Sequence, residues 1–317
     1  MEFAEIPETG ISSAYMPPAK RRLNWSILSR KMVPYIFLTP FLIGYLVFTV
    51  YPLVYAFGMS LYTKKIIGGT VFAGIANYIK VFKDGNFWEG IRNVLIFGSF
   101  QIPVMLGMAL IFALILDSVN LRRPTIFRLG FFLPFAVPSV VAALMWGYWY
   151  GQAFGPIAQI FTALGLEPPI FLTGKTILPA MANISIWQFT GYNMLILFAA
   201  LKAIPPELYE AATVDGANAW QMAWWIRIPL IRPAVILTII FSVNGTLQLF
   251  NEPNVLTVVA PSIINLHYTP NIYLYNLAFR STQFEYSAAM AFTLALVSSI
   301  LASLVLFLSR RNQGESR

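Results

Sequence analysis

Residues 201–217 read LKAIPPELYEAATVDGA, a polar stretch set between two long apolar ones. Its three carboxylates, Glu207, Glu210 and Asp215, must lie in water or against a partner, because burying an unpaired carboxylate is very costly. The Pro-Pro pair before Glu207 is suited to opening a helix, and acids in the first turns complement the positive end of the helix dipole. This stretch is therefore the strongest functional lead in the sequence.

The polar region continues as far as residue 232, and we expect it to form a helix-turn-helix. Small side chains leave the first helix open to close approach by another surface; they are Ala211, Ala212, Gly216 and Ala217. Gly216 permits a turn before a second helix over 219–227, which Pro229 and Pro233 should end. A plain connecting loop is the alternative, but about thirty residues of strong helix formers rarely serve only as a connection.

The composition indicates an all-α integral membrane protein. Hydrophobic residues make up 58% of the chain and charged residues 11%, far from the averages of soluble domains. The absence of cysteine excludes disulfides and thiolate metal sites, and a single histidine, His267, argues against a zinc site. The net charge of +8 does not indicate nucleic-acid binding, because the basic residues lie at the ends of apolar segments.

Six apolar stretches are long enough to cross a bilayer, which takes about 20 residues. We expect spans at about 33–59, 92–116, 126–150, 177–201, 233–256 and 286–309. Together they form a transmembrane domain over 33–309, with tails at 1–32 and 310–317. Prolines that can kink these helices stand at Pro40, Pro52, Pro103, Pro134 and Pro138.

An even number of spans places both termini on one side of the membrane. The two tails, the segment 117–128 and the loop 202–232 contain 14 of the 21 lysines and arginines. The positive-inside rule assigns these segments to the cytoplasm. Four lysines remain in one loop on the outer side: Lys64, Lys65, Lys80 and Lys83.

Polar residues within spans are costly, so they usually face a bundle interior or a water-filled path. Our candidates for substrate contacts are Gln188, Tyr192, Asn244, Gln248, Asn251 and Glu252. Asn244, Gln248 and Glu252 recur every four residues, which predicts one helical face. Amides, hydroxyls and aromatic rings suit sugars, although each polar residue taken alone is more typical of contacts between helices. Glu252 has a second interpretation, a structural ion pair with Arg280.

Further residues resemble a known motif. Glu210-Ala211-Ala212, Gly216 and the later Ile226, Ile228 and Pro229 resemble the EAA loop of binding-protein-dependent ABC importer permeases. The fuller string, with 203–205, Asp215-Gly216-Ala217 and Arg232-Pro233, is similar to the maltose-type carbohydrate uptake permeases. Other matching segments, in chain order, are 74–78, 132–134, 191–194 and 250–252.

The resemblance implies a type I ABC importer permease fold in the inner membrane of a prokaryote. The 202–232 loop would seat in a cleft of a cytoplasmic ATPase subunit and couple ATP-driven motion to transport. The coupling residues would be Glu207, Glu210, Ala211, Ala212, Asp215, Gly216 and Ala217. Expected partners are a second permease in a heterodimer, two ATPase subunits, an extracytoplasmic solute-binding protein and a sugar. ATP and Mg²⁺ would bind to the ATPase subunits, so the chain itself is not an enzyme and needs no cofactor.

The loop departs from the family pattern at Ala223, where an aromatic residue is usual, and Trp224 and Trp225 follow it. One of these tryptophans is expected to fill the partner's groove instead. The rival hypotheses are an ABC importer for a non-sugar solute and a secondary transporter. The latter would need ionisable residues buried within spans, and Glu252 is nearly the only candidate. A membrane-embedded enzyme is excluded, because no catalytic constellation can be assembled.

Overall fold

The computed structural model describes residues 25–65, 67–118 and 124–314, which form two compact units, 1–55 and 56–317. The first unit holds α1 (Trp25–Tyr45), η1 (Leu46–Val50) and the start of α2 (Tyr51–Ser60). The elements of the second, in order, are β1 (Tyr62–Lys65), β2 (Gly69–Phe72), α3 (Ala76–Lys83), α4 (Gly85–Ser118), α5 (Pro124–Ala136), α6 (Ser139–Trp149), α7 (Pro156–Ala163), α8 (Ile177–Lys202), α9 (Pro206–Val214), α10 (Ala219–Met222), η2 (Ala223–Arg227), α11 (Ile228–Leu230), α12 (Arg232–Leu247), α13 (Asn251–Leu256), α14 (Pro270–Tyr275), η3 (Asn276–Arg280) and α15 (Phe284–Gly314).

The first unit is an apolar helix that begins earlier than expected. The segment over 32–60 has the length and hydropathy of a membrane span, close to the expected 33–59. However, α1 starts at Trp25, so the last eight residues of the expected N-terminal tail are helical. Its apolar side chains from Met32 onward are exposed, as a helix surrounded by lipid requires. Residues 1–24 of the expected tail, and 315–317 at the other end, lie outside the described residues.

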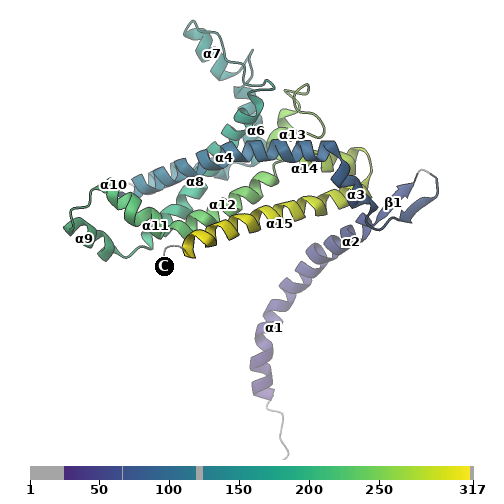
Figure 1. The fold of residues 1–317 in the computed structure, drawn as a ribbon, viewed down its shortest axis with the longest axis horizontal. Coiled ribbons are helices and arrows are strands. Elements are labelled where there is room, and N and C mark those ends of the chain that lie inside the picture. Colours follow the sequence, from purple (N-terminus) through teal and green to yellow (C-terminus); the bar gives the residue numbers. More distant parts are fainter. Residues whose placement is uncertain (1–24, 66, 119–123, 315–317) are drawn as a thin grey trace, which may run out of the picture. The chain divides into compact units, whose positions relative to one another are not determined.

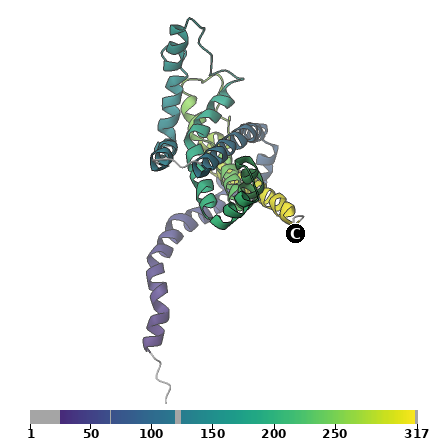
Figure 2. The same ribbon diagram turned by 90° about the vertical axis from the view of Figure 1, so that its left-hand side faces the viewer.

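The second unit is organised around α4 and α8, which pack against each other along much of their length. Their buried side chains meet in two clusters. One also receives residues from α6, α12, α13 and α14, and the other includes Ile204 and Ile231 at the ends of the 202–232 loop. In Figure 1, α4, α12 and α15 lie alongside one another, with α9 and α10 at one end and β1 and α3 at the other. In both views α6 and α7 project away from these helices (Figure 1 and Figure 2). The charged 202–232 loop and the hairpin formed by β1 and β2 therefore occupy opposite ends of the bundle (Figure 1).

The third expected span, 126–150, is not one straight helix. It divides into α5 and α6, which meet at an angle of 92°. Pro138 has no backbone N–H and disfavours helical geometry at Val137, so the helix cannot continue through this pair. The carbonyl of Val137 accepts a hydrogen bond from Gln188 Nε2 at 2.7 Å. A side chain of α8 thus pairs with backbone that the bend exposes.

The fifth expected span, 233–256, is also broken. The helix stops at Leu247 and resumes as α13 at Asn251. Pro253 cannot donate to the carbonyl of Leu249, four residues earlier, which explains the interruption. That carbonyl instead accepts a hydrogen bond from Thr269 Oγ1 at 3.1 Å, and the Leu247 carbonyl accepts one from Asn271 Nδ2 at 3.1 Å. The start of α14 therefore pairs with the exposed backbone of the break.

The end of the bundle next to the hairpin is fixed by Asp84. Its Oδ2 accepts hydrogen bonds from the hydroxyls of Tyr273 at 2.9 Å and Tyr286 at 2.6 Å, and its Oδ1 accepts one from the backbone N–H of Asn86 at 3.0 Å. Burial raises the pKa of Asp84, but these hydrogen bonds outweigh it and leave the pKa below its ordinary value. One carboxylate thus joins the start of α4 to α14 and α15.

The 202–232 loop forms the expected helix-turn-helix. Pro206 lies in the first turn of α9, and Gly216 has a φ of +79° in the turn that follows. Asn218 and Gln221 form a reciprocal capping box at the start of α10. The second helix continues from η2 into α11, passes Pro229 and ends at Leu230, between the two prolines expected to end it.

Among the described residues, five helices are long and apolar enough to cross a membrane, or six if α5 and α6 are counted as one span. The expected spans 92–116, 177–201 and 286–309 correspond to α4, α8 and α15, of which α4 and α15 extend beyond the expected bounds. The all-α class and the kinked spans are confirmed. A two-stranded antiparallel hairpin, in which Tyr62 pairs with Phe72, is the only sheet in the described part of the chain.

We predict that Gly191→Ala destabilises the protein, because α5 leaves no room for a methyl group there. A Cβ at Gly191 would lie 1.7 Å from the carbonyl oxygen of Phe131. Relieving such overpacking typically costs about 1–3 kcal/mol. Gly107→Ala in α4 is the control, since nothing lies within 4 Å of its Cβ. Thermal unfolding in detergent measures both variants, and equal melting temperatures would contradict the prediction.

Candidate solute cavity and loop

A cavity of about 250 Å³ lies between α4, α8 and the broken span α12–α13. Its lining residues are Phe97, Gln101, Met105, Ser139, Ser185, Phe189, Tyr192, Asn193, Phe241, Ser242, Gly245, Thr246, Gln248, Leu249, Phe250, Asn251 and Glu252. The break in the fifth span contributes much of this wall, because the chain turns aside at Gln248 and presents consecutive residues to the cavity. Polar side chains and aromatic rings are thus brought together inside an apolar protein.

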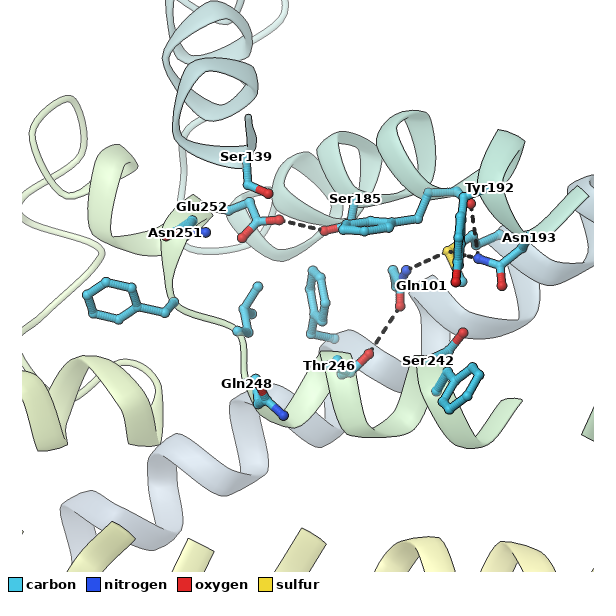
Figure 3. A pocket seen from close by; sticks show the side chains of 17 residues that line it. Gln101, Ser139, Ser185, Tyr192, Asn193, Ser242, Thr246, Gln248, Asn251 and Glu252 are labelled. Carbon is cyan, nitrogen blue, oxygen red and sulfur yellow. Dashed lines mark hydrogen bonds between the residues drawn. The ribbon is translucent and has the colours of Figure 1, made fainter. Parts of the chain in front are cut away.

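One wall of the cavity contains a buried acidic residue. Glu252 is 6% exposed, and its Oε1 accepts a hydrogen bond from Ser185 Oγ at 3.0 Å. Figure 3 shows these two side chains facing each other, with Ser139 beside them. Within the described residues no ion pair joins Glu252 to Arg280, so the interpretation of Glu252 as the partner of that arginine is wrong. Its hydrogen-bond partner is a neutral hydroxyl on α8.

A second polar group spans α4, α8 and α12. Thr246 Oγ1 donates to Gln101 Oε1 at 3.3 Å, and Gln101 Nε2 lies 3.1 Å from the sulfur of Met105. Asn193 Nδ2 donates to the Phe189 carbonyl at 3.0 Å and also points towards Met105 (Figure 3). These bonds leave acceptor and donor capacity on the amides, which a solute hydroxyl can use.

Aromatic rings complete the wall. Phe97, Phe189, Phe241 and Phe250 border the cavity. Tyr192 stacks on Phe135 of α5, with ring centroids 4.5 Å apart and planes inclined by 16°. This stacking holds the tyrosine ring, so that it presents both an apolar face and a hydroxyl towards the cavity.

The structure brings together four of the six residues expected to contact substrate. Tyr192, Gln248, Asn251 and Glu252 line the cavity, but Gln188 and Asn244 do not. Gln188 is buried beside the α5–α6 bend. Asn244 is exposed and accepts a hydrogen bond from Gln248 Nε2 at 3.1 Å. The expected face with a four-residue period is wrong, since the helix breaks between Asn244 and Glu252.

Several cavity residues were not among the sequence candidates. They are Gln101, Ser139, Ser185, Asn193, Ser242 and Thr246. Gln101 could have been selected from the sequence, because a glutamine in the middle of an apolar span is costly unless it faces polar surroundings. The serines carried no such signal, since hydroxyls within membrane helices commonly bond to their own backbone.

The 202–232 loop presents its acids to solvent. Glu207, Glu210 and Asp215 are all exposed, as expected. Of the small residues, Ala211 and Gly216 are exposed, Ala217 is half-buried and Ala212 is buried against the bundle. The four therefore do not form a single open face.

Three tryptophans stand out from the second helix of the loop. Trp220 is 71% exposed and Trp225 80% exposed, whereas Ala223 is buried. Trp220 and Trp224 contact each other edge to face, with ring centroids 5.7 Å apart. Trp225 lines one hollow with Trp220 and Trp224, and a second hollow with Asp215, Gly216, Ala217, Gln221 and Ile226. Trp225 is therefore the aromatic residue next to the acidic turn.

The geometry defines a class of protein: a polytopic membrane protein with a polar and aromatic cavity among its spans and a rigid charged loop at one end. A model of the family described as "Binding-protein-dependent transport system inner membrane component" matches residues 106–314. The chain belongs to this family, and the predicted resemblance is confirmed.

Named relatives extend the comparison. The lactose transport system permease protein LacF of Rhizobium radiobacter is 33% identical over 285 residues, which cover 88% of this chain and 94% of that protein. The arabinooligosaccharides transport system permease protein AraP of Bacillus subtilis is 29% identical, covering 95% of this chain and 96% of that protein. The trehalose/maltose transport system permease protein MalF of Thermococcus litoralis is 31% identical, covering 70% and 76%.

A solved structure agrees in fold. The crystal structure of a bacterial ABC transporter involved in the import of the acidic polysaccharide alginate superposes with a TM-score of 0.78. The alignment covers 90% of this chain and 98% of the compared chain at 22% identity. The permease fold expected from the sequence is therefore confirmed.

We predict that Gln188→Ala lowers the stability of the protein, whereas Asn251→Ala changes solute uptake. Gln188→Ala leaves the Val137 carbonyl without its donor, which should cost about 1–3 kcal/mol of stability. Asn251→Ala alters the cavity wall and should change solute uptake with little effect on unfolding. Thermal unfolding and uptake assays separate the two. The assignment of Gln188 as structural fails if its variant unfolds like the wild type but transports poorly.

Proposed function

We propose that this chain is one permease subunit of an ATP-driven importer that moves a sugar, a di- or oligosaccharide, into the cell. The observation that supports this is the combination of a cavity walled by α8 and α12–α13 with a rigid loop that joins those same two helices. Movement of the loop would act directly on the helices that surround the solute.

The wall chemistry favours a neutral polyol. Apart from Glu252, every side chain that borders the cavity is uncharged, and amides, hydroxyls and aromatic rings alternate around it. Sugar hydroxyls need both donors and acceptors, while the apolar ring faces stack on aromatic residues. The relatives named for lactose, arabinooligosaccharides and trehalose or maltose support the same solute class.

We place both termini and the 202–232 loop in the cytoplasm and the hairpin outside, from the distribution of lysine and arginine. A second, different permease chain would complete the path. Two ATPase subunits would bind ATP and Mg²⁺, and a solute-binding protein would deliver the sugar from outside. The family description and the alginate transporter solved with its periplasmic protein support the last partner.

The ATPase would receive the acidic turn together with Trp225. Glu207, Glu210 and Asp215 are exposed and free to meet basic groups, and the Trp225 ring stands beside the Gly216 turn. Large exposed aromatic residues next to a polar rim are typical of contact sites in protein interfaces. Trp225 thus takes the place of the aromatic residue missing at Ala223.

Co-expression with the genes that adjoin this one tests the assignment. We expect an ATPase, a second permease and a solute-binding protein to co-purify with the chain. The binding protein loaded with lactose, maltose, trehalose or arabino-oligosaccharides should be tested for stimulation of ATP hydrolysis. Uptake without any ATPase partner would indicate a secondary transporter, and stimulation only by a non-sugar solute would refute the sugar assignment.

We predict that Gly216→Leu lowers the amount of sugar transported per ATP hydrolysed by about tenfold. The variant protein should remain in the membrane. The φ of +79° at Gly216 disfavours a leucine, and the added side chain projects into the expected contact. Gly165→Leu is a matched control, since Gly165 also has a positive φ, +72°, and open space around it. Normal sugar transport by Gly216→Leu would contradict docking through this turn.

A further inference from the structure

A buried acid lies where three separate elements meet at the loop end of the bundle. The side chain of Asp117, in the last turn of α4, is 5% exposed. Its Oδ1 lies 2.8 Å from Lys202 Nζ at the end of α8, and its Oδ2 lies 3.4 Å from Arg227 Nε in η2. One carboxylate therefore joins two transmembrane helices and the second helix of the 202–232 loop.

Aromatic rings hold the two cations in place. The Arg227 guanidinium lies 5.1 Å from the ring centroid of Tyr209 in α9, and Lys202 Nζ lies 5.4 Å from that of Phe198 in α8. Burial and the negative charge of Asp117 raise the pKa of Tyr209. Both helices of the loop, α9 and η2, therefore contact this charged group, which we term the Asp117 clasp: Asp117, Lys202, Arg227 and Tyr209.

The clasp links the loop to a helix that the chain does not connect to it. The polypeptide joins the loop to α8 and α12 only. α4 precedes it by more than eighty residues, yet α4 contributes Phe97, Gln101 and Met105 to the cavity. Gln101 lies sixteen residues from Asp117 on the same unbroken helix, a distance of about 24 Å at about 1.5 Å per residue.

We propose that Asp117 is a positioning residue that fixes the 202–232 loop to α4, so that displacement of the loop moves the α4 wall of the cavity together with the α8 and α12 walls. This inference rests on the proposed function, in which the loop receives the motion of an ATPase. Without the clasp, displacement of the loop would still move α8 and α12, because the polypeptide joins them to it. The loop would then be free to shift relative to α4.

The chemistry of the clasp suits this role. The Asp117–Arg227 pair is largely shielded from water, so removing either partner leaves a buried uncompensated charge, whereas the Lys202 side chain is 55% exposed. A hydrophobic contact alone would permit sliding, whereas the attraction between the Asp117 carboxylate and the Arg227 guanidinium favours one register between loop and helix. Arg227 is 11% exposed at its side chain, so water competes little for this pair.

Because the chain has no cysteine, a pair of introduced cysteines can report on the clasp in the assembled complex. Spin labels at Ala219→Cys in α10 and Ile111→Cys in α4, both exposed positions, measure the distance between loop and helix. We expect a narrow distribution that Mg-ATP with vanadate leaves unchanged in the wild type. In Asp117→Asn the distribution should broaden and shift with nucleotide, and Asp117→Glu should restore the narrow form.

A second measurement reports on the accessibility of the cavity. The labelling rate of Ser242→Cys by a maleimide should change with Mg-ATP and vanadate in the wild type, and Asp117→Asn should reduce this change by about fivefold. If Asp117→Asn does not assemble, Asp117→Asn with Arg227→Gln removes both charges and should uncouple in the same way. Asp84→Asn, at the other end of α4, is the control and should leave both readouts unchanged.

The outcomes separate the two hypotheses. If the wild-type complex shows no response to Mg-ATP at all, the proposed function fails. If it responds and the clasp variants respond equally, with narrow loop-to-α4 distances, the positioning role of Asp117 is refuted while the proposed function stands. Loss of the response in Asp84→Asn as well as in the clasp variants would also refute it, because general destabilisation would then be the cause.

Discussion

Backbone groups inside a membrane must find partners within the protein, and this constraint shapes the whole molecule. Two spans are interrupted, at Val137–Pro138 and before Pro253, and each interruption leaves a carbonyl without a helical donor. Gln188 pairs with the first, and Thr269 and Asn271 pair with the carbonyls at the second. The breaks persist because neighbouring elements satisfy them, and those neighbours thereby become fixed in position.

The cavity is a consequence of the same breaks. Where α12 stops, residues 248–252 leave the helical path and face α8 and α4, so polar side chains collect there. Ser185 compensates the buried Glu252, and Thr246 bonds to Gln101. A straight fifth helix would place these residues on several faces. The interruption converts ordinary helix-to-helix contacts into a polar wall with aromatic borders.

The acidic residues at the loop end of the bundle have two different functions. The exposed acids of α9 are available to a partner, whereas the buried Asp117 serves the interior of the protein by joining α4, α8 and the loop. At the opposite end, Asp84 joins α4 to α14 and α15 through two tyrosine hydroxyls. Both ends of α4 are thus tied by carboxylates, and the cavity lies between them.

The sequence by itself determined the helical class, the approximate spans, and a helix-turn-helix with a glycine turn at Gly216, because hydropathy, proline and charge act locally. It also indicated Tyr192, Gln248, Asn251 and Glu252. Only the tertiary structure decided that Gln188 serves the bend, that Asn244 lies outside the cavity, that Trp225 stands beside the acidic turn, and that Asp117 meets Lys202 and Arg227. These outcomes depend on contacts between residues far apart in the chain, which local periodicity does not encode.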